Sequence, residues 1–220
     1  MILRLEGVLQ SWGEQSRWNY RDTGDIPTKS GVIGLLGCAM GIPRKSPELR
    51  ELALSLSVSL RVDRHGGVMM DFHTVHGNGQ RIRKADGGYL SADNPLVTNR
   101  YYLEDGCYTA FITGKEELMG KCFQALNDPV WIPFLGRKCC PPAFPLLPVM
   151  TGEYTCVEEA MGKYFWKNPP VRNMDQFLQA ELEDPAGAIR KIDMPVCSCQ
   201  YEFAERRVRR ILIRKVSDKP

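Results

Sequence analysis

The sequence predicts an α+β domain with the ferredoxin-like (RRM-like) plan. Segments with alternating apolar residues, typical of half-buried strands, and segments with helical spacing follow one another in the order β-α-β-β-α over residues 1–126. The chain has 220 residues, of which 43% are hydrophobic and 25% are charged. This size and composition suit one large folded domain and exclude a disordered, collagen-like or coiled-coil chain.

The apolar residues are too dispersed for a membrane span. The longest nearly apolar stretch, residues 31–42, has 12 residues including four glycines, whereas a transmembrane helix needs about 18 or more. The N-terminus lacks the basic start and apolar core of a signal peptide. We therefore expect a cytoplasmic protein with no membrane partner.

The first half of the chain supplies the elements of this plan. Residues 2–9 predict a first strand, and the polar, aromatic segment 12–25 predicts an ordered loop. A helix is expected to begin after Pro27, where a Thr or Ser hydroxyl can accept an unpaired backbone N–H. Glycines then recur at every third position and predict a smooth helix face that another backbone can approach: Gly31, Gly34 and Gly37. The later elements are predicted as a helix at 47–56, strands at 56–63, 68–75 and 101–113, and an amphipathic helix at 115–126.

Two regions fall outside this regular pattern. Residues 76–99 lose apolar periodicity and are rich in glycine, which is typical of a functional insertion rather than a simple connection. Residues 151–196 are also poorly periodic, and a closing pair of strands is predicted at 197–203 and 208–216. We predict a domain at 1–148 with a long insertion at 76–99, and a C-terminal extension at 149–220 with a smaller β region that packs on it.

The basic residues are clustered although the net charge is only +3. Residues 206–215 hold six basic side chains and no acidic one, and residues 77–100 hold four basic side chains against two acidic ones. A solvated charged face would explain either cluster alone. Two clusters beside glycine-rich loops favour a polyanionic partner.

The cysteines and histidines predict neither a metal site nor a cofactor. The eight cysteines lie in a chain long enough to fold without disulfides, so free thiols are expected. The close pairs Cys139-Cys140 and Cys197-x-Cys199 do not have the usual spacing of zinc ligands. No local pattern marks one cysteine as an activated nucleophile.

Four motifs in order carry a resemblance to a known family. They are Leu9-Gln-Ser-Trp-Gly13, Pro27-Thr-Lys-Ser-Gly-Val-Ile-Gly-Leu-Leu-Gly37, Asp71-Phe-His-Thr-Val75 and Phe134-Leu-Gly-Arg-Lys-Cys139. Together they resemble the CasD family of the subtype I-E CRISPR Cascade complex, which belongs to a superfamily of repeat-associated RNA-binding proteins with ferredoxin-like folds. The resemblance covers residues 1–148 strongly and residues 203–216 more loosely.

The resemblance implies a binding function. A protein of this family grips the 5′ handle of CRISPR RNA, caps one end of the filament of backbone subunits and contacts the large subunit that reads the PAM. Target DNA would be met only through the assembled complex. The insertion 76–99 takes the place of the family's thumb, which kinks the RNA where handle meets spacer. In subtype I-E a separate subunit cuts the precursor RNA, so no catalytic residue is expected here.

The residues that we predict to contact RNA come from these motifs, the loop and the insertion: Trp12, Arg17, Lys29, Ser30, Gly31, His73, Arg81, Arg83, Lys84, Arg100, Arg137 and Lys138. Lys29 and Ser30 stand at a helix start, where unpaired N–H groups favour a phosphate. From the residues alone, Ser30 simply caps the helix and Lys29 is solvated. Trp12 is of a type that stacks on unpaired bases, although core packing explains it equally well.

Two other functions compete with RNA binding. Relatives of subtype I-C cleave their own precursor RNA without a metal ion, and His73 beside Asp71 would then be a general acid or base. A pure scaffold that contacts only other proteins is the second alternative. The chain has no G-x₄-G-K-[ST] string, so nucleotide hydrolysis is disfavoured.

Overall fold

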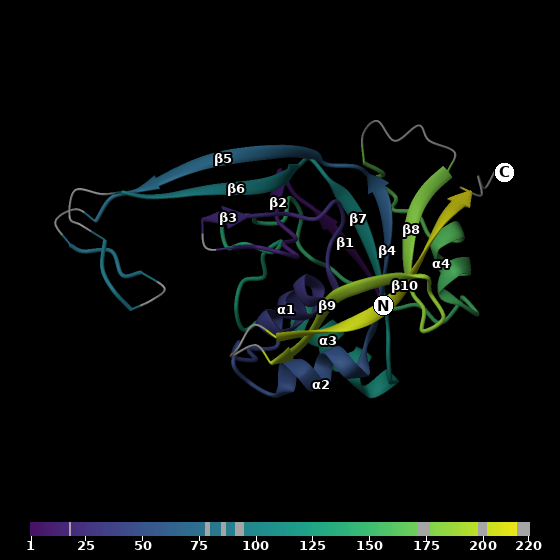
Figure 1. Cartoon of the computed structure of the whole chain (residues 1–220). Helices are drawn as coiled ribbons and strands as arrows, with labels where there is room; N and C mark the ends of the chain where they lie inside the picture. The colour runs from purple at the N-terminus through teal and green to yellow at the C-terminus, as the bar shows by residue number, and fades with distance from the viewer. Residues whose placement is uncertain are drawn as a thin grey trace.

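The computed structural model describes residues 1–17, 19–77, 80–84, 87–90, 95–170, 177–197 and 202–214. These residues form a body built on one large antiparallel sheet, and a long two-stranded arm that projects from the body (Figure 1). No helix in this part of the chain has both the length and the apolar character needed to cross a bilayer.

The sheet of the body has six strands in the order β1-β7-β4-β8-β10-β9. Their bounds are β1 Ile2–Glu6, β4 Ser57–Arg64, β7 Cys107–Thr113, β8 Phe177–Glu183, β9 Ile189–Cys197 and β10 Glu202–Arg214. Alternate residues of each strand point to opposite faces. One face, with Leu3 and Leu60, packs in the main core, and the other, with Ile2 and Phe111, packs in a second, smaller core.

Helices cover both faces of this sheet (Figure 1). The main core is closed by α1 Lys29–Ala39, α2 Glu48–Ser55 and α3 Glu116–Asn127, whereas α4 Val157–Lys163 lies on the smaller core. Helix α1 begins as predicted, because the Thr28 side chain accepts a hydrogen bond from the backbone N–H of Gly31 at 3.1 Å. The helices predicted at 47–56 and 115–126 are confirmed within one residue or two.

The ferredoxin-like order is present in the first three strands of the body. Along the chain, β1, β4 and β7 and the helices between and after them follow the order β-α-β-β-α. In the sheet, β7 lies between β1 and β4. The next strand, β8, joins the sheet beside β4 rather than beside β1. The free side of β1 carries an isolated bridge from Ile2 to Val149.

The arm belongs to a second sheet, which consists of β2 Leu9–Gln10, β3 Tyr20–Arg21, β5 Gly67–Val75 and β6 Leu96–Glu104. Strands β5 and β6 pair over nine residues, from Gly67 opposite Glu104 to Val75 opposite Leu96. The small strands β2 and β3 hold the base of β6.

This arrangement corrects three strand predictions. The strand predicted at 2–9 is two strands, because β1 ends at Glu6 in the body and β2 lies in the second sheet. Residues 68–75 form a strand, but it belongs to the arm and not to the ferredoxin-like sheet. Residues 101–113 are not one strand: a turn at Asp105, which has a φ of +52°, separates β6 from β7. The insertion therefore starts at Gly67 and ends at Glu104, and the predicted range 76–99 is its outer part.

The C-terminal region continues the sheet of the body. The pairing of β9 with β10 confirms a closing pair of strands, although the first lies at 189–197 instead of 197–203. Helix α4, strand β8 and all but the last residue of strand β9 lie within the stretch 151–196, for which the sequence predicts no element. The division into units at 1–148 and 149–220 stays a prediction.

Candidate nucleic-acid interface

The register of the second sheet places polar and basic side chains on one face of the arm. Arg100 of β6 lies opposite Arg21 of β3 and opposite Asp71 of β5, and Thr98 lies opposite His73. Residues directly opposite each other in a sheet share a face, as do residues two apart on one strand. These five residues therefore form one face, which we call the polar face of the arm.

The other face of the arm is uncharged and largely exposed. It carries Val68, Met70 and Phe72 of β5, together with Tyr20 of β3 and Tyr101 of β6, whose rings lie 4.9 Å apart. The Phe72 side chain is 60% exposed. The arm thus has one apolar face and one polar face, and the cations lie on the polar one.

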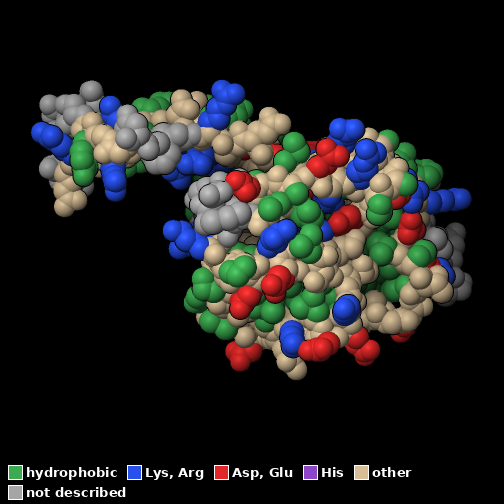
Figure 2. Space-filling model, turned by 60° about the horizontal axis from the view of Figure 1, so that its bottom comes forward, with side chains coloured by type: hydrophobic (Ala, Val, Ile, Leu, Met, Phe, Trp, Pro, Cys, Tyr) green, Lys and Arg blue, Asp and Glu red, His purple; other side chains and the backbone are tan. Residues whose placement is uncertain are grey.

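The outer part of the arm adds exposed cations. Arg81, Arg83 and Lys84 are all exposed, and Arg83 forms a β-bridge with Tyr89. Hydrogen bonds from the backbone N–H of Lys84 to the carbonyl of Gly88, and from Gly87 back to Lys84, shape this region. Within the described ranges, none of the three cations is paired with a carboxylate. Figure 2 shows Lys and Arg side chains along the projecting arm and on the neighbouring edge of the body.

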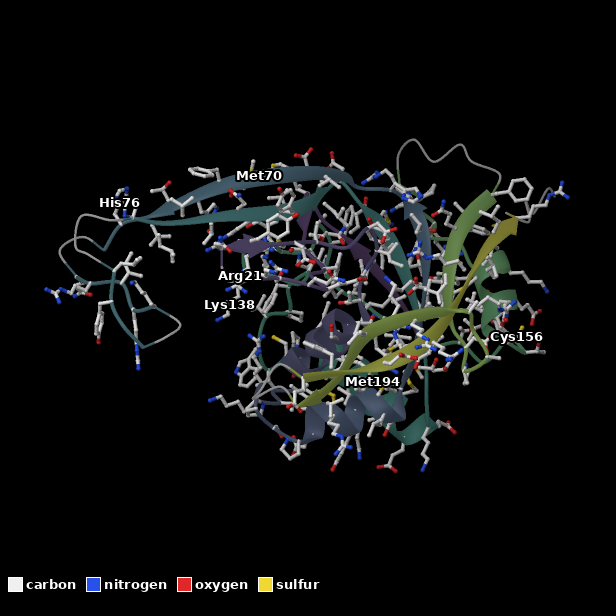
Figure 3. All side chains as sticks on the ribbon, in the orientation of Figure 1. Arg21, Met70, His76, Lys138, Cys156 and Met194 are labelled. Atoms are coloured by element: carbon white, nitrogen blue, oxygen red, sulfur yellow. The ribbon has the colours of Figure 1, made fainter. Side chains whose placement is uncertain are left out.

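A tight turn places Lys138 beside the base of the arm. Leu135 and Cys140 close the turn by a backbone hydrogen bond of 2.8 Å, and Gly136 adopts a φ of +86°. Lys138 is exposed, and Figure 3 shows it with Arg21 below the arm, on the side of the body. The electrostatic effect of Lys138 also lowers the pKa of Cys38, although burial outweighs it and that pKa is raised overall.

The predicted phosphate site at the start of α1 is already filled by the protein. The Lys29 side chain is 2% exposed, and its Nζ lies 2.6 Å from Oε1 of Glu183. Its backbone N–H donates to Asp193 at 2.8 Å, so a carboxylate occupies the position expected for a phosphate. Ser30 is half-buried, with its hydroxyl 3.2 Å from that of Thr28.

The helix glycines serve packing within the protein. A Cβ at Gly31 would lie 2.6 Å from the ring of Trp12, and one at Gly37 would lie 2.3 Å from Leu49, whereas Gly34 faces open space. Trp12 itself is 1% exposed, and its indole N–H donates to Gln10 at 3.0 Å. Trp12 and Lys29 are therefore corrected from RNA contacts to core residues, because burial leaves them no surface for a ligand. Gly31 is half-buried against Trp12, and its contact with RNA stays a prediction.

Three arginines of the second basic cluster are paired with carboxylates. Arg206 lies 2.6 Å from Asp193, Arg209 lies 2.9 Å from Glu158, and Arg210 lies 3.2 Å from Glu181. Burial opposes the charge of Arg206, but hydrogen bonding to Asp193 and its other carboxylate neighbours raise the pKa of this guanidinium above its ordinary value. These three arginines thus hold the C-terminal strands together and do not form an open cationic strip. Lys215 lies outside the described residues.

The remaining predicted residues are spread over the interface. Arg17 is exposed in the loop before β3, and Arg100 donates to the Thr98 hydroxyl at 3.2 Å. His73 is hydrogen-bonded to Asp71 through Nε2 on the polar face. Arg137 is half-buried and is directed at protein carbonyls. Among the described residues no three His, Cys, Asp or Glu side chains gather as metal ligands.

Arg21 lies on the polar face although the sequence predicts only a polar loop at 12–25, because the structure places it opposite Arg100. The pairing of β3 with β6 decides its position, and a two-residue strand has no detectable period.

A ferredoxin-like body and an arm whose polar face carries Arg21 and Arg100 are the architecture that we expect of a nucleic-acid-binding protein. Comparison with known sequences shows the family. A family model described as CRISPR-associated protein (Cas_Cas5) matches residues 1–209. The chain belongs to this family.

Individual relatives agree with the family. The chain is 34% identical over 158 residues to the CRISPR system Cascade subunit CasD of Escherichia coli strain K12, a match that covers 66% of this chain and 68% of that protein. A chain of a solved structure called a CRISPR RNA-guided surveillance complex is 28% identical, with a TM-score of 0.77, over 97% of this chain and 90% of that one. A crystal structure of a Cas protein gives a TM-score of 0.72 at 30% identity, over 98% and 95% of the two chains. The resemblance drawn from the four motifs and the predicted fold class are confirmed.

Proposed function

We propose that this protein is an RNA-binding subunit of a Cascade-type surveillance complex and that it holds the 5′ handle of CRISPR RNA. The single observation that carries the proposal is the polar face of the arm, with Arg21 and Arg100, between the Lys138 turn and the cations of the outer arm. The relative named CasD is a Cascade subunit, and the structural neighbour comes from a CRISPR RNA-guided complex. Both support the same function.

The geometry suits a bent single strand. Arg81, Arg83 and Lys84 would contact phosphates at the outer arm, and Lys138 and Arg17 would contact phosphates near the body. Phosphate contacts fix the position of the RNA and release counterions, but they do not read its sequence. Sequence-specific reading of the RNA would come from contacts to base edges and from base stacking.

The same proposal names the protein partners. By its resemblance the subunit would cap one end of the backbone filament and contact the large PAM-reading subunit, so that target DNA is met only through the complex. We also propose that the subunit is not catalytic and uses no cofactor or metal ion.

Precursor cleavage is the alternative, and a specific observation favours it. The hydrogen bond between His73 and Asp71 orients a histidine on the polar face, as in a general acid or base. If the protein cleaves RNA, His73→Ala abolishes specific cleavage of labelled repeat RNA by the purified chain. We expect no cleavage by either protein.

The test of the main proposal is assembly. The chain is co-expressed with the products of the neighbouring Cascade genes, the complex is purified, and its nucleic acid is extracted and sequenced. We expect one CRISPR RNA per complex, whose handle crosslinks to peptides that contain Arg100 or Lys138. A stoichiometric complex without RNA contradicts the proposal, and a complex in which crosslinks avoid this chain identifies it as a scaffold.

A further inference from the structure

Arg137 uses its guanidinium almost entirely within the protein. Its Nη1 donates to the carbonyl of Tyr101 at 3.2 Å, and its Nη2 donates to the carbonyls of Arg21 and Asp22 at 3.0 and 3.2 Å. Its Cζ lies 4.7 Å from the centre of the Tyr102 ring. Three parts of the chain thus meet at one side chain: the turn at 135–140, strand β6 and the segment that follows β3.

The turn that carries Arg137 is held in a defined shape. The N–H of Ser11 donates to the carbonyl of Leu135 at 3.1 Å, and the N–H of Cys140 donates to the carbonyl of Arg137 at 2.8 Å. A Cβ at Gly136 would lie 1.7 Å from the Ser11 carbonyl oxygen. The backbone on both sides of Arg137 is therefore fixed against the body, and its side chain extends from a preorganised base.

The next residue, Lys138, is directed at solvent and not at the protein. Lys138 is exposed, and it is paired with no carboxylate within the described part of the chain. The two adjacent cations in the motif Gly136-Arg137-Lys138 therefore differ: the first is bound to backbone carbonyls, and the second is presented to solvent.

We propose that Arg137 is a positioning residue and not an RNA contact. It ties the segment 19–25 to the base of the arm and so keeps Arg21 and Lys138 on one surface. The effect of this tie on RNA binding rests on the proposed function, but the tie itself does not.

The choice of arginine follows from the geometry. A planar guanidinium can donate in several directions in its plane while its face lies on an aromatic ring. A lysine ammonium at the same position would keep the charge, but it could not reach three carbonyls and cover Tyr102 at once. Hydrogen bonds from a charged donor are also stronger than those between neutral groups.

Three variants of the full-length chain separate positioning from contact. Arg137→Gln removes the guanidinium, Arg137→Lys keeps the charge and serves as the milder change if the first variant folds poorly, and Lys138→Gln is the matched neighbour. Binding to fluorescein-labelled repeat RNA is titrated at several salt concentrations. Hydrogen exchange by mass spectrometry follows the peptide that covers residues 19–25.

We expect both Arg137 variants to bind RNA more weakly at every salt concentration with an unchanged salt slope. Exchange at 19–25 should become about tenfold faster, which corresponds to the loss of roughly one charged hydrogen bond. Lys138→Gln should leave that exchange unchanged and reduce the magnitude of the slope by ~0.7, the value for one phosphate contact on a single strand.

Two results overturn the inference: a reduced salt slope in Arg137→Gln, or unchanged exchange at 19–25 in both Arg137 variants. A different result separates it from the proposed function. If the wild-type chain and its complex bind no RNA while exchange at 19–25 accelerates in both Arg137 variants, the positioning role holds and the RNA-binding function is wrong.

Discussion

The backbone N–H of Lys29 donates to the carboxylate of Asp193 at 2.8 Å, across 164 positions of the sequence. The same carboxylate accepts two hydrogen bonds from Arg206, at 2.6 and 2.9 Å. Asp193 of β9 thus accepts a hydrogen bond from the backbone N–H at the start of α1 and neutralises Arg206 of β10. This relationship joins the N-terminal helix to the C-terminal strands.

The first prediction concerns this buried pair. Asp193→Ala leaves Arg206 buried without its principal partner, and losing one member of a buried ion pair costs about 3–5 kcal/mol. We expect urea denaturation to show that the free energy of unfolding falls by this amount. Lys121→Ala is the control, because its pair with Glu117 is exposed and solvent screening leaves such a pair little effect on stability. Equal small losses in both variants would show that Asp193 is not essential to the body.

The second prediction concerns the outer arm. Replacing Arg81, Arg83 and Lys84 with Ala should reduce the magnitude of the salt slope of RNA binding by about two units, because each phosphate contact contributes ~0.7. Thermal unfolding should be unchanged, since all three side chains are exposed. A triple variant with wild-type slope and affinity in the assembled complex would exclude a phosphate-binding role. Loss of partner subunits with normal RNA affinity would identify a protein-docking loop.

The third prediction separates core from interface at Trp12. Trp12→Ala should lower the free energy of unfolding by about 3–5 kcal/mol, as expected when a large buried side chain is removed. The salt slope of the folded fraction should not change, because the ring faces Gly31 and not solvent. Chemical denaturation and RNA titration on the same preparation measure both quantities. A stable variant with weakened RNA binding would restore Trp12 as a base-stacking residue.

The fourth prediction compares two glycines with the same φ of +86°, Gly136 and Gly87. At Gly87 an added Cβ meets no atom of the described residues within 4 Å, so Gly87→Ala should cost only the backbone strain of about 1 kcal/mol. At Gly136 the added Cβ lies 1.7 Å from a backbone carbonyl, so the turn must move. We expect Gly136→Ala to be markedly less stable in thermal unfolding. If the two variants are equally stable, the turn at 135–140 is not held as described.

The fifth prediction concerns thiol reactivity. Burial is the main cause that raises the pKa of Cys107 and of Cys140 to about 12 each, and that of Cys122 to about 11. Because the thiolate is the reactive form, these three thiols stay protonated and unreactive in the native protein at pH 8. Cys139 and Cys156 are exposed. Mass spectrometry after brief iodoacetamide treatment should find alkylation at the two exposed positions first, and at the three buried ones only after unfolding.

Part of this molecule follows from local sequence. The cap at Thr28 and the helical spacing at 115–126 each depend on neighbours within a few positions, and the structure agrees with both. The strand predicted at residues 2–9 is present over Ile2–Glu6. The four motifs identified the family because their order and spacing are properties of the chain itself. The exposed cations of the outer arm could be predicted for the same reason, since an aperiodic, glycine-rich stretch buries little.

Other features depend on contacts between distant segments, which no local pattern contains. Lys29 looks like an anion-binding residue until β8 and β9 bring Glu183 and Asp193 to it. The arginines of β10 look like a cationic strip until carboxylates from several elements pair with Arg206, Arg209 and Arg210. The roles of these cations are therefore decided by tertiary structure, because the energy of a charge depends on burial and on the charges beside it. The sequence by itself determined where the cations lie along the chain, and the fold decided which of them stay exposed.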